Sequence, residues 1–289
     1  MPPHCRRWAE WVSIIVYEQL ISVESIPPLS ATASRLLVMA SDPDVDIDRL
    51  CLVIERDPPL TAKVVGIANS AFYAPRQPVY TVKDAIIRVL GLRMVSNLAF
   101  GLAVSGGLST VGCERFDVTR YWMIALGTAD MASGLARAST LSDKPDPDVV
   151  YLAGLLHTLG QLALVHLRPR EMMEVLRQSA EQPEIDVLEL ERAALGVDRW
   201  AVGAMLVRHW QLPPVIGDSI EAFAAGGGAD ADSMVQLLRA ARRWIEAALA
   251  GRSDPLRVTG VDEAYCEHRT SVFLDGYDAL KSLAGSLHA

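Results

Sequence analysis

Residues 151–167 have the sequence YLAGLLHTLGQLALVHL and contain no Asp, Glu, Lys or Arg. A helix over this stretch is apolar on nearly every face, which is typical of a helix at the centre of a helical protein. Two adjacent polar residues, His157 and Thr158, lie in its middle. Neighbouring side chains on a helix point about 100° apart, so both can border one cavity. A His–Asp pair at this place would suit a metal ion, but Thr158 offers no charge.

The composition favours a helical protein. Hydrophobic residues make up 51% of the 289-residue chain and aromatic residues only 6%, so Leu, Val, Ile and Ala must build the core. Such a core favours helices over a β-sandwich. We therefore expect an all-α fold.

Charge and cysteine content limit the function and the compartment. The net charge of −8 argues against a nucleic-acid binder, whose affinity rests on neutralising phosphates. An arginine cluster, Arg239, Arg242 and Arg243, is interpreted as one solvated helix face. The four cysteines are far apart in the sequence and predict reduced thiols. No secretion signal is predicted from the Arg6–Arg7 start, and residues 149–167 are interpreted as a buried helix without membrane insertion, so we expect a cytoplasmic protein.

Turn and capping residues divide the chain into helices. We expect helices over residues 8–22, 31–40, 47–55, 58–68, 82–90, 92–104, 117–138, 151–167, 168–180, 186–195, 198–210, 213–225 and 232–250, and one or two more over 261–287. Asp57-Pro58 is interpreted as a helix start, and Asn69-Ser70 as a helix end. Gly226 to Gly228 predict a flexible joint.

Five segments together resemble the HDOD domain, the HD-related output domain of bacterial signalling proteins. They are IPPLSATASRLLVMASDP (26–43), LCLVIERDPPLTAKVVGIANSAFY (50–73), VKDAIIRVLGLRMVSNLAFGLAV (82–104), YLAGLLHTLGQLAL (151–164) and LGVDRWAVGAMLVRHWQLPPVI (195–216). The ERDPPLT…IANSAFY block followed by the GLLHTLG block is the specific part. The resemblance predicts an HDOD domain over residues 26–225, an amphipathic helical extension over 1–25, and C-terminal helices over 226–289 packed on the same body.

The resemblance implies a fold related to the HD metal-dependent phosphohydrolases, in which His and Asp side chains hold cations that activate water. His157 matches the His of the HD pair, but Thr158 stands where the Asp would be. Relatives commonly have His at the positions of Ile124 and, in some cases, Arg199, and a His pair near Phe223. The loss of these donors predicts a site that holds no metal, needs no cofactor and is partly filled by side chains.

We therefore expect a non-catalytic regulatory or scaffold protein of bacterial signal transduction that acts through contacts with other signalling proteins. Formation of a homo-oligomer stays open, and the helix over residues 8–22 is the candidate docking element. Two alternatives stay open: a metal-dependent phosphohydrolase with a rearranged ligand set, and a small-nucleotide-binding module. For the latter, Asp57, Asn69, Ser70 and His157 are the candidate cleft residues. Against this, His157 is expected to be a hydrogen-bonded core histidine, and Thr158 to bond the carbonyl one turn back.

Overall fold

The computed structural model describes residues 26–40, 45–224, 232–252 and 254–287, and this part of the chain is helical without any β-strand. The expected helix over residues 8–22 and the glycine joint at 226–228 lie outside these ranges. The elements are α2 (Ala31–Ala40), α3 (Ile47–Glu55), α4 (Pro58–Ala68), α5 (Val82–Ala85), the π-helix η2 (Ile86–Leu90), α6 (Leu92–Ser105), α7 (Val118–Ala138), α8 (Pro147–Leu156), α9 (Leu159–Leu167), α10 (Pro169–Glu181), α11 (Val187–Leu195), α12 (Arg199–His209), α13 (Pro214–Ala224), α14 (Ser233–Leu249), α15 (Glu263–Asp275) and α16 (Tyr277–Ser286).

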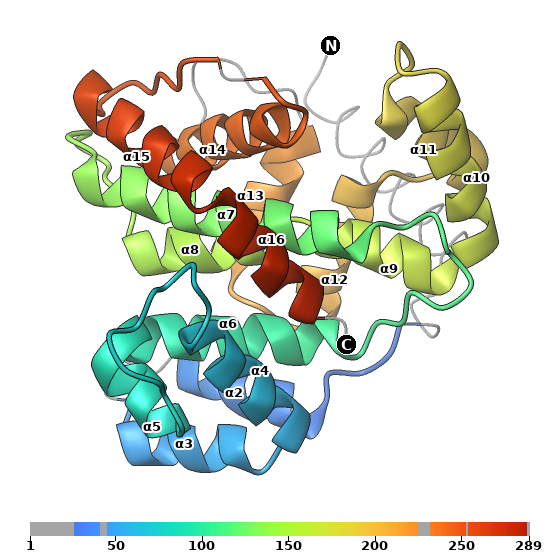
Figure 1. Cartoon of the computed structure of the whole chain (residues 1–289). Helices are drawn as coiled ribbons and strands as arrows, with labels where there is room; N and C mark the ends of the chain where they lie inside the picture. Colours follow the sequence, from blue (N-terminus) through green and yellow to red (C-terminus); the bar gives the residue numbers. More distant parts are fainter. Residues whose placement is uncertain (1–25, 41–44, 225–231, 253, 288–289) are drawn as a thin grey trace, which may run out of the picture.

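Helix α7 is the element on which the others assemble (Figure 1). It packs most extensively against α8 and α14, and also against α15 and α16. Helices α2 to α6 form a neighbouring group that joins the rest mainly through the packing of α6 on α8. On the other side, α12 packs on both α9 and α13, while α10 and α11 form a hairpin beside α9. The helices after residue 231 thus lie on the same body as those before it.

Aspartate caps explain why most helix starts could be predicted. In eight helices the residue before the first turn is an Asp whose side chain accepts a hydrogen bond from a backbone N–H of that turn, which satisfies a donor that the helix itself leaves unpaired. These caps are Asp46, Asp57, Asp117, Asp146, Asp186, Asp198, Asp232 and Asp262.

The prediction of one continuous helix over residues 151–167 is wrong. Helix α8 ends at Leu156, α9 begins at Leu159, and His157 and Thr158 form the turn between them. The carbonyl of Gly154 would accept the amide of Thr158 in a continuous helix, but the His157 ring binds it, with Nδ1 2.5 Å from that oxygen. The two halves also pack on different partners, α8 on α7 and α9 on α12.

The turn has two consequences. It places His157 and Thr158 at a junction of helices, and it contradicts the expectation that Thr158 bonds a carbonyl within a regular helix. The stretch 147–167 is long and apolar enough to cross a membrane. However, 83% of its apolar 18-residue segment is buried inside the fold. A second expected helix, over residues 82–90, is also interrupted, because it widens into the π-helix η2 from Ile86.

Candidate functional site

His157 is a fully buried, neutral histidine. Its side chain is 1% exposed, and Nδ1 donates to the Gly154 carbonyl, which fixes the ring proton on Nδ1 because a carbonyl only accepts. Burial, reinforced by the positive charge of Arg242, lowers the pKa of His157 to about 3, against the opposing hydrogen bond to Gly154. Nε2 therefore carries a lone pair, and it has no hydrogen-bond partner in the structure. The expectation of a buried, hydrogen-bonded histidine at this position is confirmed.

The low pKa of His157 predicts a specific loss of stability in acid. The unfolded chain takes up the proton at its ordinary pKa near 6.5, so the contribution is complete above that pH and is lost as the pH falls towards 3. Between pH 7 and pH 5 the free energy of unfolding should fall by about 2 kcal/mol on this account. Urea unfolding at both pH values should show a smaller decrease in His157→Asn. The exposed His209→Asn control should behave as the wild type, and an unchanged decrease in His157→Asn would contradict the assignment.

Two aromatic rings stack in parallel over His157. The Phe223 ring from α13 lies 5.5 Å from the imidazole, centroid to centroid, at an interplanar angle of 24°. The Trp200 ring from α12 lies 4.9 Å from Phe223 at 11° and 6.3 Å from His157. Side chains thus fill part of this region, as expected, and they include Phe223 and Trp200.

Arg242 packs against the two aromatic rings of the stack. The guanidinium carbon of Arg242, from α14, lies 4.4 Å from the Trp200 ring centroid and 5.8 Å from that of Phe223. Its side chain is only 11% exposed, and Nη2 pairs with Glu246 Oε1 at 2.7 Å. Burial lowers the pKa of Arg242, whereas the charge of Glu246 raises it. The prediction that Arg239, Arg242 and Arg243 share one solvated face is therefore wrong for Arg242, because α14 turns this side chain towards α12 and α13.

Thr158 and Ile124, at two positions where the family resemblance would place metal ligands, are both uncharged. Thr158 is 3% exposed, and its hydroxyl lies beside that of Tyr121 rather than bonding a helix carbonyl. Burial raises the pKa of Tyr121 to about 12, and the nearby hydroxyls of Thr158 and Ser105 oppose this increase. Ile124 is buried in α7. Hydroxyl and alkyl groups thus stand where carboxylate and imidazole donors would be needed.

Arg199 is committed to a buried ion pair. Its Nη2 lies 2.5 Å from Glu191 Oε1, and its backbone N–H donates to the other carboxylate oxygen at 2.9 Å. Glu191 is fully buried and the Arg199 side chain is 9% exposed. The pair joins α11 to α12. Arg192 and Asp198 add a second contact between the same helices, partly exposed.

The remaining predicted cleft residues lie at the two ends of α4. Asp57 caps the start of α4, and Asn69 ends it, so the two are separated by the length of an 11-residue helix, about 16 Å. The Asn69 side chain bonds both the amide and the carbonyl of Val79 and so fastens the loop before α5. The Ser70 hydroxyl is buried and without a partner. Asp57 and Asn69 are thus engaged at opposite ends of α4.

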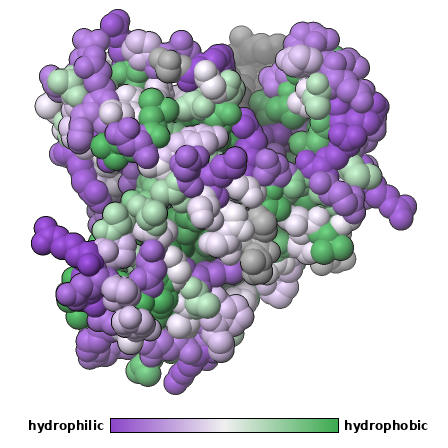
Figure 2. All heavy atoms as spheres, viewed as in Figure 1, coloured by the Kyte–Doolittle hydropathy of each residue, from purple (hydrophilic) through white to green (hydrophobic). Residues whose placement is uncertain are grey.

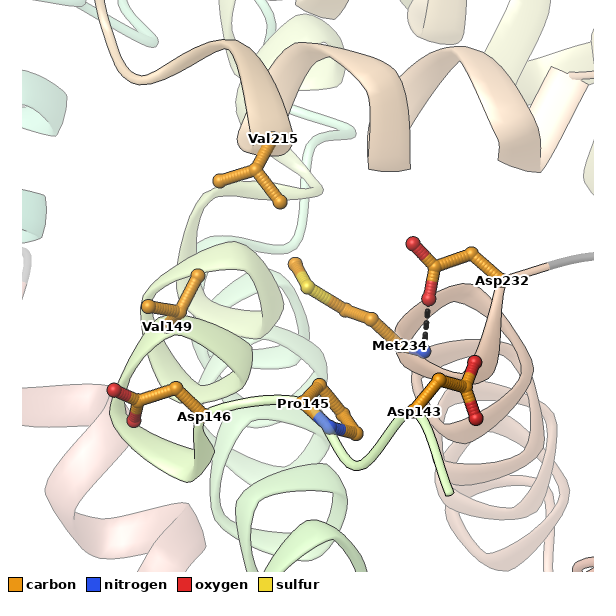
Figure 3. A pocket seen from close by; sticks show the side chains of 7 residues that line it. All are labelled: Asp143, Pro145, Asp146, Val149, Val215, Asp232 and Met234. Carbon is orange, nitrogen blue, oxygen red and sulfur yellow. Dashed lines mark hydrogen bonds between the residues drawn. The ribbon is translucent and has the colours of Figure 1, made fainter. Parts of the chain in front are cut away.

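A pocket of about 440 Å³ lies elsewhere, between the α7–α8 loop and the starts of α13 and α14 (Figure 3). Its walls combine apolar side chains with three carboxylates, those of Asp143, Asp146 and Asp232. Each carboxylate already accepts a hydrogen bond: Asp143 from the Ser233 hydroxyl, and the other two from the amides of the helices they cap. This pocket could not be predicted from sequence patterns, because its walls come from three separate segments.

The comparison with protein families decides the relationship. A model of the HDOD domain matches residues 26–225. The chain belongs to the HDOD family. The match confirms the family resemblance, and the all-helical architecture agrees with it.

Solved structures share the HDOD fold with this chain. A protein of Marinobacter aquaeolei, provisionally assigned to signal transduction, is 29% identical with a TM-score of 0.76, covering 92% of this chain and 60% of that one. An HDOD domain protein with unknown function from Geobacter sulfurreducens is 21% identical with a TM-score of 0.69, covering 96% and 98%. A Shewanella amazonensis protein, provisionally assigned as a phosphohydrolase, is 22% identical with a TM-score of 0.73, covering 92% and 96%.

An uncharacterized protein of Treponema pallidum is 28% identical over 195 residues, which are 67% of this chain. The chain spans 37% of that protein's length and, as noted, 60% of the Marinobacter protein.

The HDOD site of this chain does not fit the metal ion that related HD enzymes use. His157 keeps one feature of a ligand, since Nδ1–H is held by a carbonyl and Nε2 is free. However, the described residues contain no group of three or more His, Cys, Asp or Glu side chains placed to hold an ion. Phe223 and Trp200 stack on His157, and the guanidinium of Arg242 lies over these two rings. One imidazole beside a cation is a poor donor set for a divalent metal.

Proposed function

We propose that this HDOD protein is a non-catalytic regulatory component of bacterial signal transduction that works in the cytoplasm through contacts with other proteins. The observation that carries the proposal is the closed environment of His157, which Phe223 and Trp200 cover and Arg242 flanks. Membership of the HDOD family and the likeness to the Marinobacter protein support the signalling part.

A phosphohydrolase would need further anionic or neutral donors next to His157. The carboxylates nearest the stack are already used, Glu246 by Arg242 and Glu191 by Arg199. Releasing either one would leave an arginine buried without its partner, which is costly. The arrangement therefore supports a role that does not depend on water activation.

Exposed apolar side chains on the α2–η2 group support association with another protein. Val38, Leu52 and Ile87 lie on α2, α3 and η2, and Tyr80 lies just before α5, each with more than half of its surface accessible. Exposed apolar side chains of this kind are available for contact with another protein. Figure 2 shows apolar atoms among polar ones on this part of the surface.

Affinity capture from the source organism tests the contact role. The full chain as bait should retain a defined partner. If residues 1–25 bind that partner, a chain lacking them should stay folded but no longer retain it. Circular dichroism melting of both baits separates loss of docking from loss of folding. Leu52→Lys is a matched surface variant that tests the α2–η2 group. Retention of no specific partner by the folded full-length protein would contradict the proposal.

A further inference from the structure

We propose that Arg242 supplies the permanent positive charge of the closed HDOD site, in place of a bound divalent ion. The inference rests on the non-catalytic part of the proposed function. Its test measures ligand binding and stability, so it can fail without affecting the capture of a partner.

The geometry makes Arg242 a link between four separate segments. The guanidinium comes from α14, Trp200 from α12 and Phe223 from α13, and the Phe223 ring in turn stacks on His157 in the α8–α9 turn. A guanidinium over aromatic faces is attracted by the negative charge of those faces, and the attraction is stronger where water is excluded. The side chain therefore joins helices whose sequence positions are far apart, as a metal ion with ligands from several helices would.

The charges around Arg242 are balanced without an ion. Arg242 pairs with Glu246, and Arg199 pairs with Glu191. Both arginines are almost wholly buried. The Nε and Nη2 atoms of Arg242 both donate hydrogen bonds to Glu246 Oε1. A divalent ion near His157 would add two positive charges to this balanced set, which already contains the guanidinium of Arg242. Repulsion in a poorly solvated site would oppose its binding.

Chemical rescue distinguishes this role from ordinary packing. Arg242→Ala removes the atoms of an ethylguanidinium ion and leaves a space bordered by the Trp200 ring and the Glu246 carboxylate. We expect the variant to melt about 5 °C or more below the wild type. Added ethylguanidinium should restore the melting temperature in a concentration-dependent manner, because a ligand that binds only the folded state stabilises it. Ethylammonium, with the same charge but no planar group, should restore less.

Arg243→Ala is the matched control, since Arg243 is the next residue on the same helix and is exposed. It should melt close to the wild type and should not respond to ethylguanidinium. Equal melting temperatures of Arg242→Ala and Arg243→Ala would overturn the proposal. So would rescue of Arg242→Ala by Mn²⁺ and not by ethylguanidinium. If Arg242→Ala does not fold, Arg242→Lys and Arg242→Met separate charge from packing: a higher melting temperature for Arg242→Lys than for Arg242→Met supports the proposal, and equal or reversed values overturn it.

Discussion

Gly160→Ala is expected to destabilise the protein by about 4 kcal/mol or more, the largest effect we predict for a single methyl group. A Cβ at this position would overlap the carbonyl oxygen of Arg199 and lie 2.5 Å from the amide nitrogen of Gly203. Both obstacles are backbone atoms of α12, so no side chain can rotate away. Helices α9 and α12 would have to separate, and this would displace Trp200 from His157.

Gly66→Ala is the matched control for Gly160→Ala. Gly66 lies inside α4, and a Cβ there would meet nothing within 4 Å. Alanine should stabilise that helix by about 0.5–1 kcal/mol, because it restricts the unfolded chain without strain. Urea unfolding of both variants measures the contrast. A Gly160→Ala protein as stable as the wild type would show that α9 and α12 are not in such close contact.

Glu191→Gln is expected to cost about 3–5 kcal/mol, the second largest effect. The substitution keeps the size of the side chain but removes its charge, and so leaves the Arg199 guanidinium almost fully buried with no negative partner. The backbone N–H of Arg199 also donates to this carboxylate, and a Gln side chain has one acceptor oxygen in place of two. Chemical denaturation should therefore show a large decrease in unfolding free energy and a loosened α11–α12 contact.

An exposed ion pair provides the comparison for Glu191→Gln. Glu181 pairs with Arg177 on the surface of α10, where both side chains are more than one-third accessible. Glu181→Gln should change stability little, because water and salt screen exposed pairs. Similar losses for the two substitutions would mean that burial of the Glu191–Arg199 pair does not matter.

The sequence was informative where local rules decide the structure. Asp57 and Asp198 each cap the helix that follows them, so the starts of α4 and α12 could be predicted from the sequence. The buried state of His157 followed from its apolar surroundings in the sequence. The HDOD family could be recognised because several helices kept their characteristic segments in order.

Contacts between distant segments were beyond the sequence. The break at His157 depends on α8 and α9 packing on different helices, and an apolar stretch is compatible with one long helix as well. Arg242 looked like a surface residue because it lies next to Arg243, and only the placement of α13 against α14 buries it. Glu191 was missed for the same reason, since its partner Arg199 belongs to another helix.

The metal content of the purified protein shows whether the HDOD site holds a divalent ion. Wild type and Thr158→Asp should be equilibrated with Mn²⁺, freed of loosely bound ions and measured by elemental analysis. We expect no stoichiometric divalent ion in the wild type or in Thr158→Asp, because one added carboxylate does not remove Arg242 or supply the other ligands. About one tightly bound ion per chain, in the wild type or in Thr158→Asp, would contradict this expectation.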